Sequence, residues 1–122
     1  MKYNFANGLV LSSDGQGWSV EGGGNVFQLK SLEDYRRVVS LLEKTFEEAE
    51  KELGPEFFYS GVILAGLNSK SEYWIDLALL WAADSGLGVD ADINHKLSEL
   101  IAHDQLSQSA RNKAKTLISQ NK

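Results

Sequence analysis

Short apolar stretches alternate with turn residues over the first thirty positions of the chain. Asn-Gly at 7–8 and Asp-Gly at 14–15 are dipeptides that accept the positive φ angles of tight hairpin turns, and the glycines at 22–24 form a flexible connection. Around these turns lie four β-prone pieces, at residues 3–5, 9–11, 18–20 and 26–29. The pattern predicts an antiparallel hairpin or meander of two or three strands within residues 1–30. Because so small a sheet is not stable alone in water, it must pack on the rest of the chain.

The next segment has apolar side chains at helical spacing. They recur every three or four positions and define one face: Leu32, Tyr35, Val38, Val39, Leu42, Phe46, Ala49 and Leu53. Ser31 followed by Asp34 resembles a capping box, which satisfies free amides at a helix start. Gly54-Pro55 ends the pattern, since glycine accepts a left-handed cap and proline cannot continue a helix. The sequence therefore predicts one continuous helix over residues 31–53.

Four more helices are predicted after it, each with its own start or stop signal. Residues 56 to about 67 are apolar on nearly all sides, so this helix is expected at the centre of the core. Ser69 with Glu72 forms a second capping-box signature and opens a helix that continues to about residue 83, where Asp84-Ser85-Gly86 ends it. The inward seam of that helix is Trp74, Leu77, Ala78 and Trp81, flanked by Tyr73 and Leu80. Asp90 is the N-cap expected for the next helix, and Ser107 for the last one.

The short connections between these segments predict that neighbouring helices run antiparallel. The pairs 56–83 and 91–119 share a layout, which indicates stacked helical hairpins. The predicted fold class is α+β, mainly α: a short N-terminal antiparallel β-hairpin or meander followed by about five antiparallel helices. A length of 122 residues is usual for one domain, so residues 1–122 are interpreted as a single domain. It comprises a β-hairpin segment, 1–30, and a helical bundle, 31–122.

The composition excludes several classes of function. There is no cysteine, so disulfides, thiolate metal sites and cysteine nucleophiles are absent from the chain. The net charge of −5 is the wrong sign for a phosphate-binding surface, so we expect no nucleic acid as partner. No run approaches the roughly 20 apolar residues of a membrane helix, and the first residues lack a signal-peptide core. We therefore expect a cytoplasmic protein with no membrane partner.

The best candidates for metal or catalytic chemistry are Asp92, His95, Glu99 and His103. Positions 95, 99 and 103 share one face of a helix, and imidazole and carboxylate groups together can bind zinc. The apolar residues of the same helix lie on the opposite side, so this stripe is expected to face water. We interpret it as a solvated face and expect no metal and no cofactor.

Other routes to catalysis lack the residue patterns that they require. The two glycine clusters, at residues 15–17 and 22–24, lie between predicted strands, whereas a phosphate-binding loop leads into a helix N-terminus. No Gly-x-Ser-x-Gly is present, and both histidines fall on one predicted helix. The basic residues of the last helix are interpreted as its solvated outer face: Arg111, Lys113, Lys115 and Lys122. We therefore expect that the protein is not an enzyme and has no small-molecule substrate.

The densest charge cluster lies in the segment 43–56, which carries six glutamates against two lysines. Carboxylates near the end of a helix are disfavoured by its macrodipole, which makes a functional interpretation more attractive. Tyr73 and Asp76 lie off the inward seam of their helix, and aromatic side chains are enriched at protein interfaces. The predicted partner-binding residues are Glu43, Glu47, Glu50, Tyr73, Asp76, Asp84 and Asp90.

The chain resembles, in its layout, small bacterial immunity proteins of polymorphic and contact-dependent growth inhibition toxin systems. The stretches that carry the resemblance are MKYNFANGLVL, GWSV…NVFQLKSLEDY and SEYWIDLALLWAADSGL…INHKLSELIAHDQLSQSARNKAKTLI. The resemblance implies tight binding to a cognate toxin, with its active site or an essential surface covered. Because nuclease toxins are often basic, an acidic inhibitor agrees with the charge of this chain.

Three hypotheses are compatible with these features. The first is an immunity protein that neutralises a cognate, basic, nuclease-type toxin. The second is a helical adaptor or regulatory subunit of a protein complex, suggested by the stacked hairpins. The third is a small metal-dependent enzyme that uses the stripe between residues 92 and 103.

Overall fold

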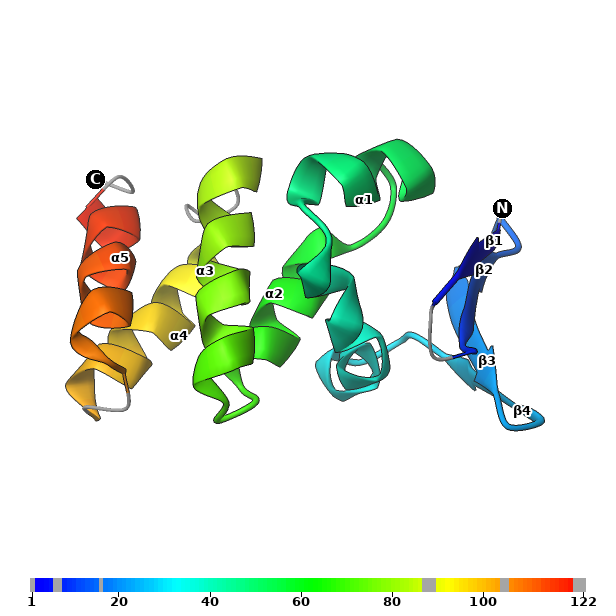
Figure 1. Ribbon diagram of the computed structural model, residues 1–122, viewed down its shortest axis with the longest axis horizontal. Helices are drawn as coiled ribbons and strands as arrows, with labels where there is room; N and C mark the ends of the chain where they lie inside the picture. Colours follow the sequence, from blue (N-terminus) through cyan, green and yellow to red (C-terminus); the bar gives the residue numbers. More distant parts are fainter. Residues whose placement is uncertain (1, 6–7, 16, 87–89, 104–105, 120–122) are drawn as a thin grey trace.

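The computed structural model of the protein describes residues 2–5, 8–15, 17–86, 90–103 and 106–119. An N-terminal sheet lies at one end of an elongated molecule and the last helix at the other, with the remaining helices arranged between them (Figure 1). The elements are β1 (Lys2–Asn4), β2 (Val10–Ser13), β3 (Trp18–Gly22), β4 (Asn25–Gln28), η1 (Leu32–Glu43), α1 (Phe46–Leu53), α2 (Tyr59–Leu67), α3 (Glu72–Ser85), α4 (Ala91–Ala102) and α5 (Gln108–Ser119). The predicted fold class, α+β and mainly α, is confirmed.

The sheet is an antiparallel meander in the order β1-β2-β3-β4, with four strands where two or three were expected. Tyr3, Leu11, Val20 and Phe27 are cross-strand neighbours and therefore share one face. Leu11 and Val20 are fully buried, so this face is the one that packs on the helices.

Tight hairpin turns were expected at residues 7–8 and 14–15, but the two-residue turn of the sheet is at residues 23–24. Gly22 pairs with Asn25, which leaves only Gly23 and Gly24 between β3 and β4, and both have positive φ, as a type I′ turn requires. Ser13 pairs with Trp18, so the connection after β2 is four residues long and is no two-residue turn at 14–15. The expected turn at 7–8 includes Asn7, which lies outside the described residues.

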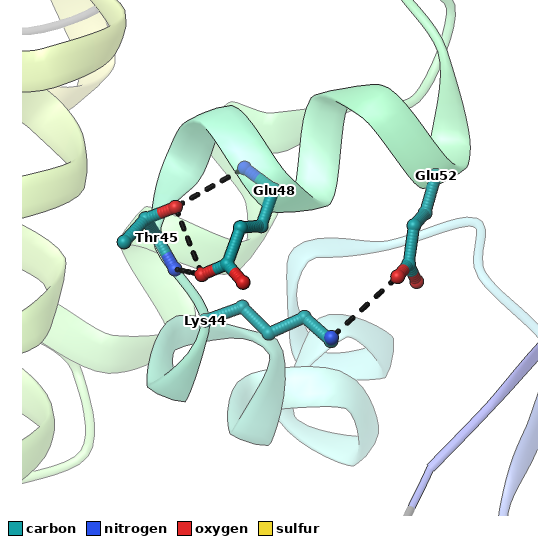
Figure 2. Close-up of polar contacts among 4 residues, drawn as sticks. All are labelled: Lys44, Thr45, Glu48 and Glu52. Atoms are coloured by element: carbon teal, nitrogen blue, oxygen red, sulfur yellow. Dashed lines mark hydrogen bonds and ion pairs between the residues drawn. The ribbon is translucent and has the colours of Figure 1, made fainter.

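The single helix predicted over residues 31–53 is wrong. The chain forms a 3₁₀ helix, η1, with non-helical backbone angles at Val38, and then a separate helix, α1. Lys44 and Thr45 between them are extended. Thr45 begins a new capping box (Figure 2): the Glu48 amide donates to the Thr45 hydroxyl at 3.1 Å, and the Thr45 amide donates to the Glu48 carboxylate at 3.1 Å. The apolar spacing continues across this break, which is why the pattern alone did not reveal it.

We expect Thr45→Ala to lower the free energy of unfolding by about 1 kcal/mol, the usual effect of losing an N-cap hydroxyl. The substitution leaves an amide at the start of α1 without its side-chain acceptor. Thermal and urea unfolding followed by circular dichroism would measure the change. Ser98→Ala, at an exposed position within α4, is the control and should leave stability unchanged within about 0.5 kcal/mol. Equal effects of the two variants would contradict a helix start at Thr45.

The same capping box makes stability depend on pH. Hydrogen bonds from the Thr45 amide and hydroxyl lower the pKa of Glu48, so folding favours the ionised carboxylate. This contribution is present above the ordinary glutamate pKa of 4.5 and is lost as the pH falls through the lower folded-state value. We expect Glu48→Gln to show a shallower loss of melting temperature than the wild type below about pH 4.5. Asp34, whose pKa is lowered by the Ser31 and Lys30 amides, maintains part of the slope in both proteins.

The central position predicted for the second helix is confirmed. All nine residues of α2 are buried, although the helix begins at Tyr59 and not at residue 56. It contacts η1, α3 and α4. Tyr59 also packs by its ring against Phe46 and Phe57, and its hydroxyl donates to the Gly54 carbonyl. Burial raises the pKa of Tyr59 to about 12.

The predicted stacked helical hairpins are present. The α2–α3 hairpin lies beside the α4–α5 hairpin, with α2 in contact with α4 and α3 in contact with α5 (Figure 1). One expected cap is wrong: the Trp74 amide donates to Ser71, whereas the Ser69 hydroxyl donates to the Gly66 carbonyl at the end of α2. Gly86 ends α3 in the left-handed conformation, and the Ala110 amide donates to Ser107 at the start of α5, both as expected.

One cluster of buried side chains runs from the sheet into the helices. Trp18 of β3 meets Phe57, ahead of α2, edge to face, with ring centroids 5.1 Å apart. The guanidinium of Arg37 lies 3.7 Å from the centre of the Phe27 ring. Within the described part of the chain, no helix is long and apolar enough to cross a membrane.

Candidate functional site

The outward side of α3 exposes two large apolar side chains. Tyr73 and Leu80 are 55% and 48% exposed, and they lie two turns apart on the same side of the helix. Leu77, predicted on the inward seam, is only half-buried and lies between them, whereas Ala78 and Ala82 point into the core. We call the surface formed by Tyr73, Asp76, Leu77, Leu80 and Asp84 the α3 face.

A residue at the end of η1 joins this surface. The Tyr73 hydroxyl donates a 2.6 Å hydrogen bond to the Glu43 carboxylate, although thirty positions separate the two residues in the sequence. This bond raises the pKa of the Tyr73 hydroxyl, because it favours the protonated phenol. The Tyr73 ring also meets Trp74 edge to face at 4.9 Å. Two residues predicted separately as partner contacts are thus brought together.

The charge of α3 has one sign. The helix carries Glu72, Asp76 and Asp84 and contains no lysine or arginine. Asp84 is exposed in the last turn, where the helix dipole disfavours a carboxylate. Asp76 lies one turn from Tyr73 and is half-buried. The α3 face therefore combines exposed apolar groups with carboxylates, and no ion pair among the described residues involves Asp76 or Asp84.

The glutamates of α1 are arranged differently from what the sequence suggested. Because α1 begins after Thr45, Glu47 and Glu48 lie in its first turn, where the dipole favours carboxylates. The prediction that the helix macrodipole disfavours these carboxylates is therefore wrong for Glu47 and Glu48. Glu48 belongs to the capping box, and Glu52 pairs with Lys44 at 3.6 Å (Figure 2). The dense acidic cluster is thus partly used in holding α1.

Glu47 and Glu50 remain exposed on α1, but none of the ion pairs of the described residues links either of them to the α3 face. Glu50 acts on Tyr59 instead, where its charge adds to the raised pKa of the phenol. Glutamate and a basic residue stand four positions apart at Glu47 and Lys51 and at Glu33 and Arg37, a spacing that allows a pair on a helix, but neither pair is among the ion pairs of the described residues.

Asp90 has a local structural role. Its carboxylate accepts hydrogen bonds from the amides of Asp92 and Ile93 at 2.9 and 3.3 Å, as an N-cap should. The Ser60 hydroxyl of α2 approaches the same carboxylate at 3.4 Å. Asp90 therefore links the two hairpins, and no described contact joins it to the α3 face.

The stripe on α4 holds ion pairs. Glu99 accepts from Lys96 at 3.1 Å and lies 4.0 Å from the exposed His95. The Lys96 ammonium lowers the pKa of the Glu99 carboxyl, which keeps it charged. In the described ranges, no three histidine, aspartate or glutamate side chains converge as metal ligands would.

Two hollows lie away from the α3 face, and neither was expected from the sequence. One, of about 530 Å³, lies beside β3 and β4 and includes Trp18 and Val26. The other, of about 470 Å³, lies where the α2–α3 connection meets α4, with Ile75 and Leu100 in its lining. Neither hollow includes a residue that was predicted to bind a partner.

The α3 face with Glu43 is therefore the site at which the greatest number of the predicted residues meet: Glu43, Tyr73, Asp76 and Asp84. Leu80 is not among the predicted partner-binding residues, because the sequence pattern places it at the flank of an inward seam, yet it is 48% exposed on this face. Comparison of the chain with protein families, with curated proteins and with solved structures finds no match.

Proposed function

We propose that this protein is an immunity protein, which binds a cognate, basic, nuclease-type bacterial toxin in the cytoplasm and neutralises it. Inhibition would result from covering the active site of the toxin or another surface that it needs. The observation that supports this proposal most strongly is the α3 face, where exposed Tyr73 and Leu80 stand among carboxylates without a basic residue on the helix.

Such a surface suits a basic protein for two separate reasons. Negative charge speeds the encounter with a positively charged partner and disfavours acidic ones. Exposed aromatic and aliphatic side chains then supply the contacts that exclude water and slow dissociation. The net charge of −5 extends the same preference to the whole molecule.

The layout resemblance supports the class of partner. Immunity proteins act by binding, so the proposal requires no metal, cofactor or catalytic residue. The ion pairs of the α4 stripe agree with this, because Glu99 is already engaged by Lys96.

Co-expression with a toxin domain encoded immediately upstream tests the proposal. We expect the protein to restore growth of cells that express the toxin and to purify with it as a stable complex. If the neighbouring toxin is neither bound nor neutralised, the proposal is wrong.

A helical adaptor or regulatory subunit is the second candidate, and the stacked α2–α3 and α4–α5 hairpins favour it. Recovery of a stable cellular complex that contains no toxin would support this alternative.

A further inference from the structure

Glu43 and Tyr73 together have the properties of a binding site for a planar cation, and we call this pair of residues the seat. The carboxylate ends η1, the ring begins α3, and the 2.6 Å hydrogen bond fixes one against the other. The edge contact of the ring with Trp74 further restricts its orientation. Binding of a partner would therefore cost little side-chain entropy at Glu43 and Tyr73, because these two groups are already ordered.

Glu43 keeps spare capacity to accept hydrogen bonds. Tyr73 uses one carboxylate oxygen, and among the described residues no lysine, arginine or histidine pairs with Glu43. A carboxylate has about four lone-pair sites, so several remain open. The adjacent Lys44 does not neutralise it, because that ammonium pairs with Glu52 and lies 5.4 Å from the Tyr3 ring.

The exposed Tyr73 ring supplies the second half of the seat. A guanidinium stacks on an aromatic face and donates two parallel hydrogen bonds to a carboxylate, whereas an ammonium is a compact charge without that planar fork. The molecule already contains the stacking geometry once, where the Arg37 guanidinium lies 3.7 Å from the Phe27 ring centre.

We infer that Glu43 and Tyr73 together bind an arginine side chain presented by the protein partner, with Leu77 and Leu80 receiving apolar groups next to it. This inference rests on the proposed function and specifies its chemistry. The basic residue of the partner that contacts Glu43 and Tyr73 is then an arginine, and a lysine at the same position would bind more weakly.

The probes are hexa-arginine and hexa-lysine peptides of equal charge, titrated into the ¹⁵N-labelled full-length protein and followed by NMR. We expect hexa-arginine to shift the amide signals of Glu43, Tyr73 and Trp74 and to bind roughly five times more tightly than hexa-lysine. Equal affinities, or shifts that leave these amides unchanged, would overturn the inference.

Three variants assign the effect to the two groups. Glu43→Gln and Tyr73→Ala should each weaken hexa-arginine binding by about five-fold. Tyr73→Phe keeps the ring and should lose less than Tyr73→Ala. Asp92→Asn removes one exposed carboxylate of α4 and is the matched charge control, with affinity expected to change less than two-fold. Equal losses in Asp92→Asn and Glu43→Gln would reduce the effect to net charge and overturn the seat.

Failure of this inference is distinguishable from failure of the proposed function. If the toxin is neutralised but arginine and lysine peptides bind alike, the seat is wrong and the immunity function stands. If the arginine preference is found but no neighbouring toxin is neutralised, the function is wrong and the seat stands.

Discussion

The Trp81→Ala variant is expected to lose about 3–5 kcal/mol of unfolding free energy, the usual cost of truncating a buried aromatic side chain. Trp81 is 2% exposed and lies within ring-contact distance of Phe46 and Tyr59, at centroid separations of 5.6 and 6.1 Å. Its indole nitrogen also donates to the Lys44 carbonyl at 2.8 Å. The side chain thus joins α3 to the break between η1 and α1.

Urea unfolding followed by tryptophan fluorescence and circular dichroism would measure this loss. Trp81→Phe, which keeps a ring but lacks the donor, should fall between the wild type and Trp81→Ala. Leu80→Ala is the control, since this neighbour is 48% exposed and should cost roughly 0.5 kcal/mol or less. A Trp81→Ala variant as stable as Leu80→Ala would contradict the packing described for α3.

The second large effect is expected at Gly66, where α2 approaches α3 closely. A Cβ atom at this position would lie 2.9 Å from the Ala78 Cβ and 3.1 Å from the Trp74 carbonyl oxygen, as well as 2.6 Å from the Leu42 side chain. The Leu42 methyl can rotate away, but the two contacts with α3 involve its backbone and first side-chain atom. A larger residue must therefore separate the two helices.

We expect Gly66→Val to be destabilised by about 3 kcal/mol, because overpacking costs roughly 1–3 kcal/mol and valine adds two methyl groups beyond the Cβ. Gly66→Ala should be milder, since the better helix propensity of alanine returns up to about 1 kcal/mol. Gly17→Ala is the control, because nothing lies within 4 Å of a Cβ there. Chemical denaturation of the three variants would rank them, and a Gly66→Val variant as stable as Gly17→Ala would contradict the close helix contact.

The elements that could be predicted from sequence are those whose signals are local and agree with one another. The helix α2 is apolar on all sides and is buried on all sides. The ends at Gly54 and Gly86, the cap at Asp90 and the α+β class are confirmed for the same reason, because each depends on residues close in the chain.

The break at Thr45 could not be predicted from apolar spacing, because both helices continue one periodic stripe. The contact that accompanies it comes from Trp81, thirty-seven positions later in the chain. Once the break exists, Glu47 and Glu48 change from a helix end to a helix start. The wrongly predicted helix boundary thus also made the predicted macrodipole effect on these two glutamates wrong.

The candidate surface was predicted in part. Tyr73 and Asp76 were predicted to lie off the inward seam of one helix, and Asp84 was predicted as a partner contact just beyond its end. Only the fold shows that α3 includes Asp84 and that Glu43 touches Tyr73. Asp90 was predicted both as an N-cap and as a partner contact. The cap is confirmed, and the Ser60 hydroxyl also approaches the same carboxylate. Charge alone does not separate carboxylates that hold the fold from those that remain open to a partner.

The central claim, that the α3 face binds a basic toxin, is tested most directly by calorimetric titration of the purified protein with the toxin domain encoded next to its gene. Leu80→Arg places a bulky cation in the middle of this face, and Leu32→Arg makes the same change in η1, at a leucine that is 45% exposed. We expect tight binding of the wild type, a loss of affinity of about 100-fold in Leu80→Arg, and a change of less than about three-fold in Leu32→Arg. No binding by the wild type, or the same affinity in both variants, would contradict the claim.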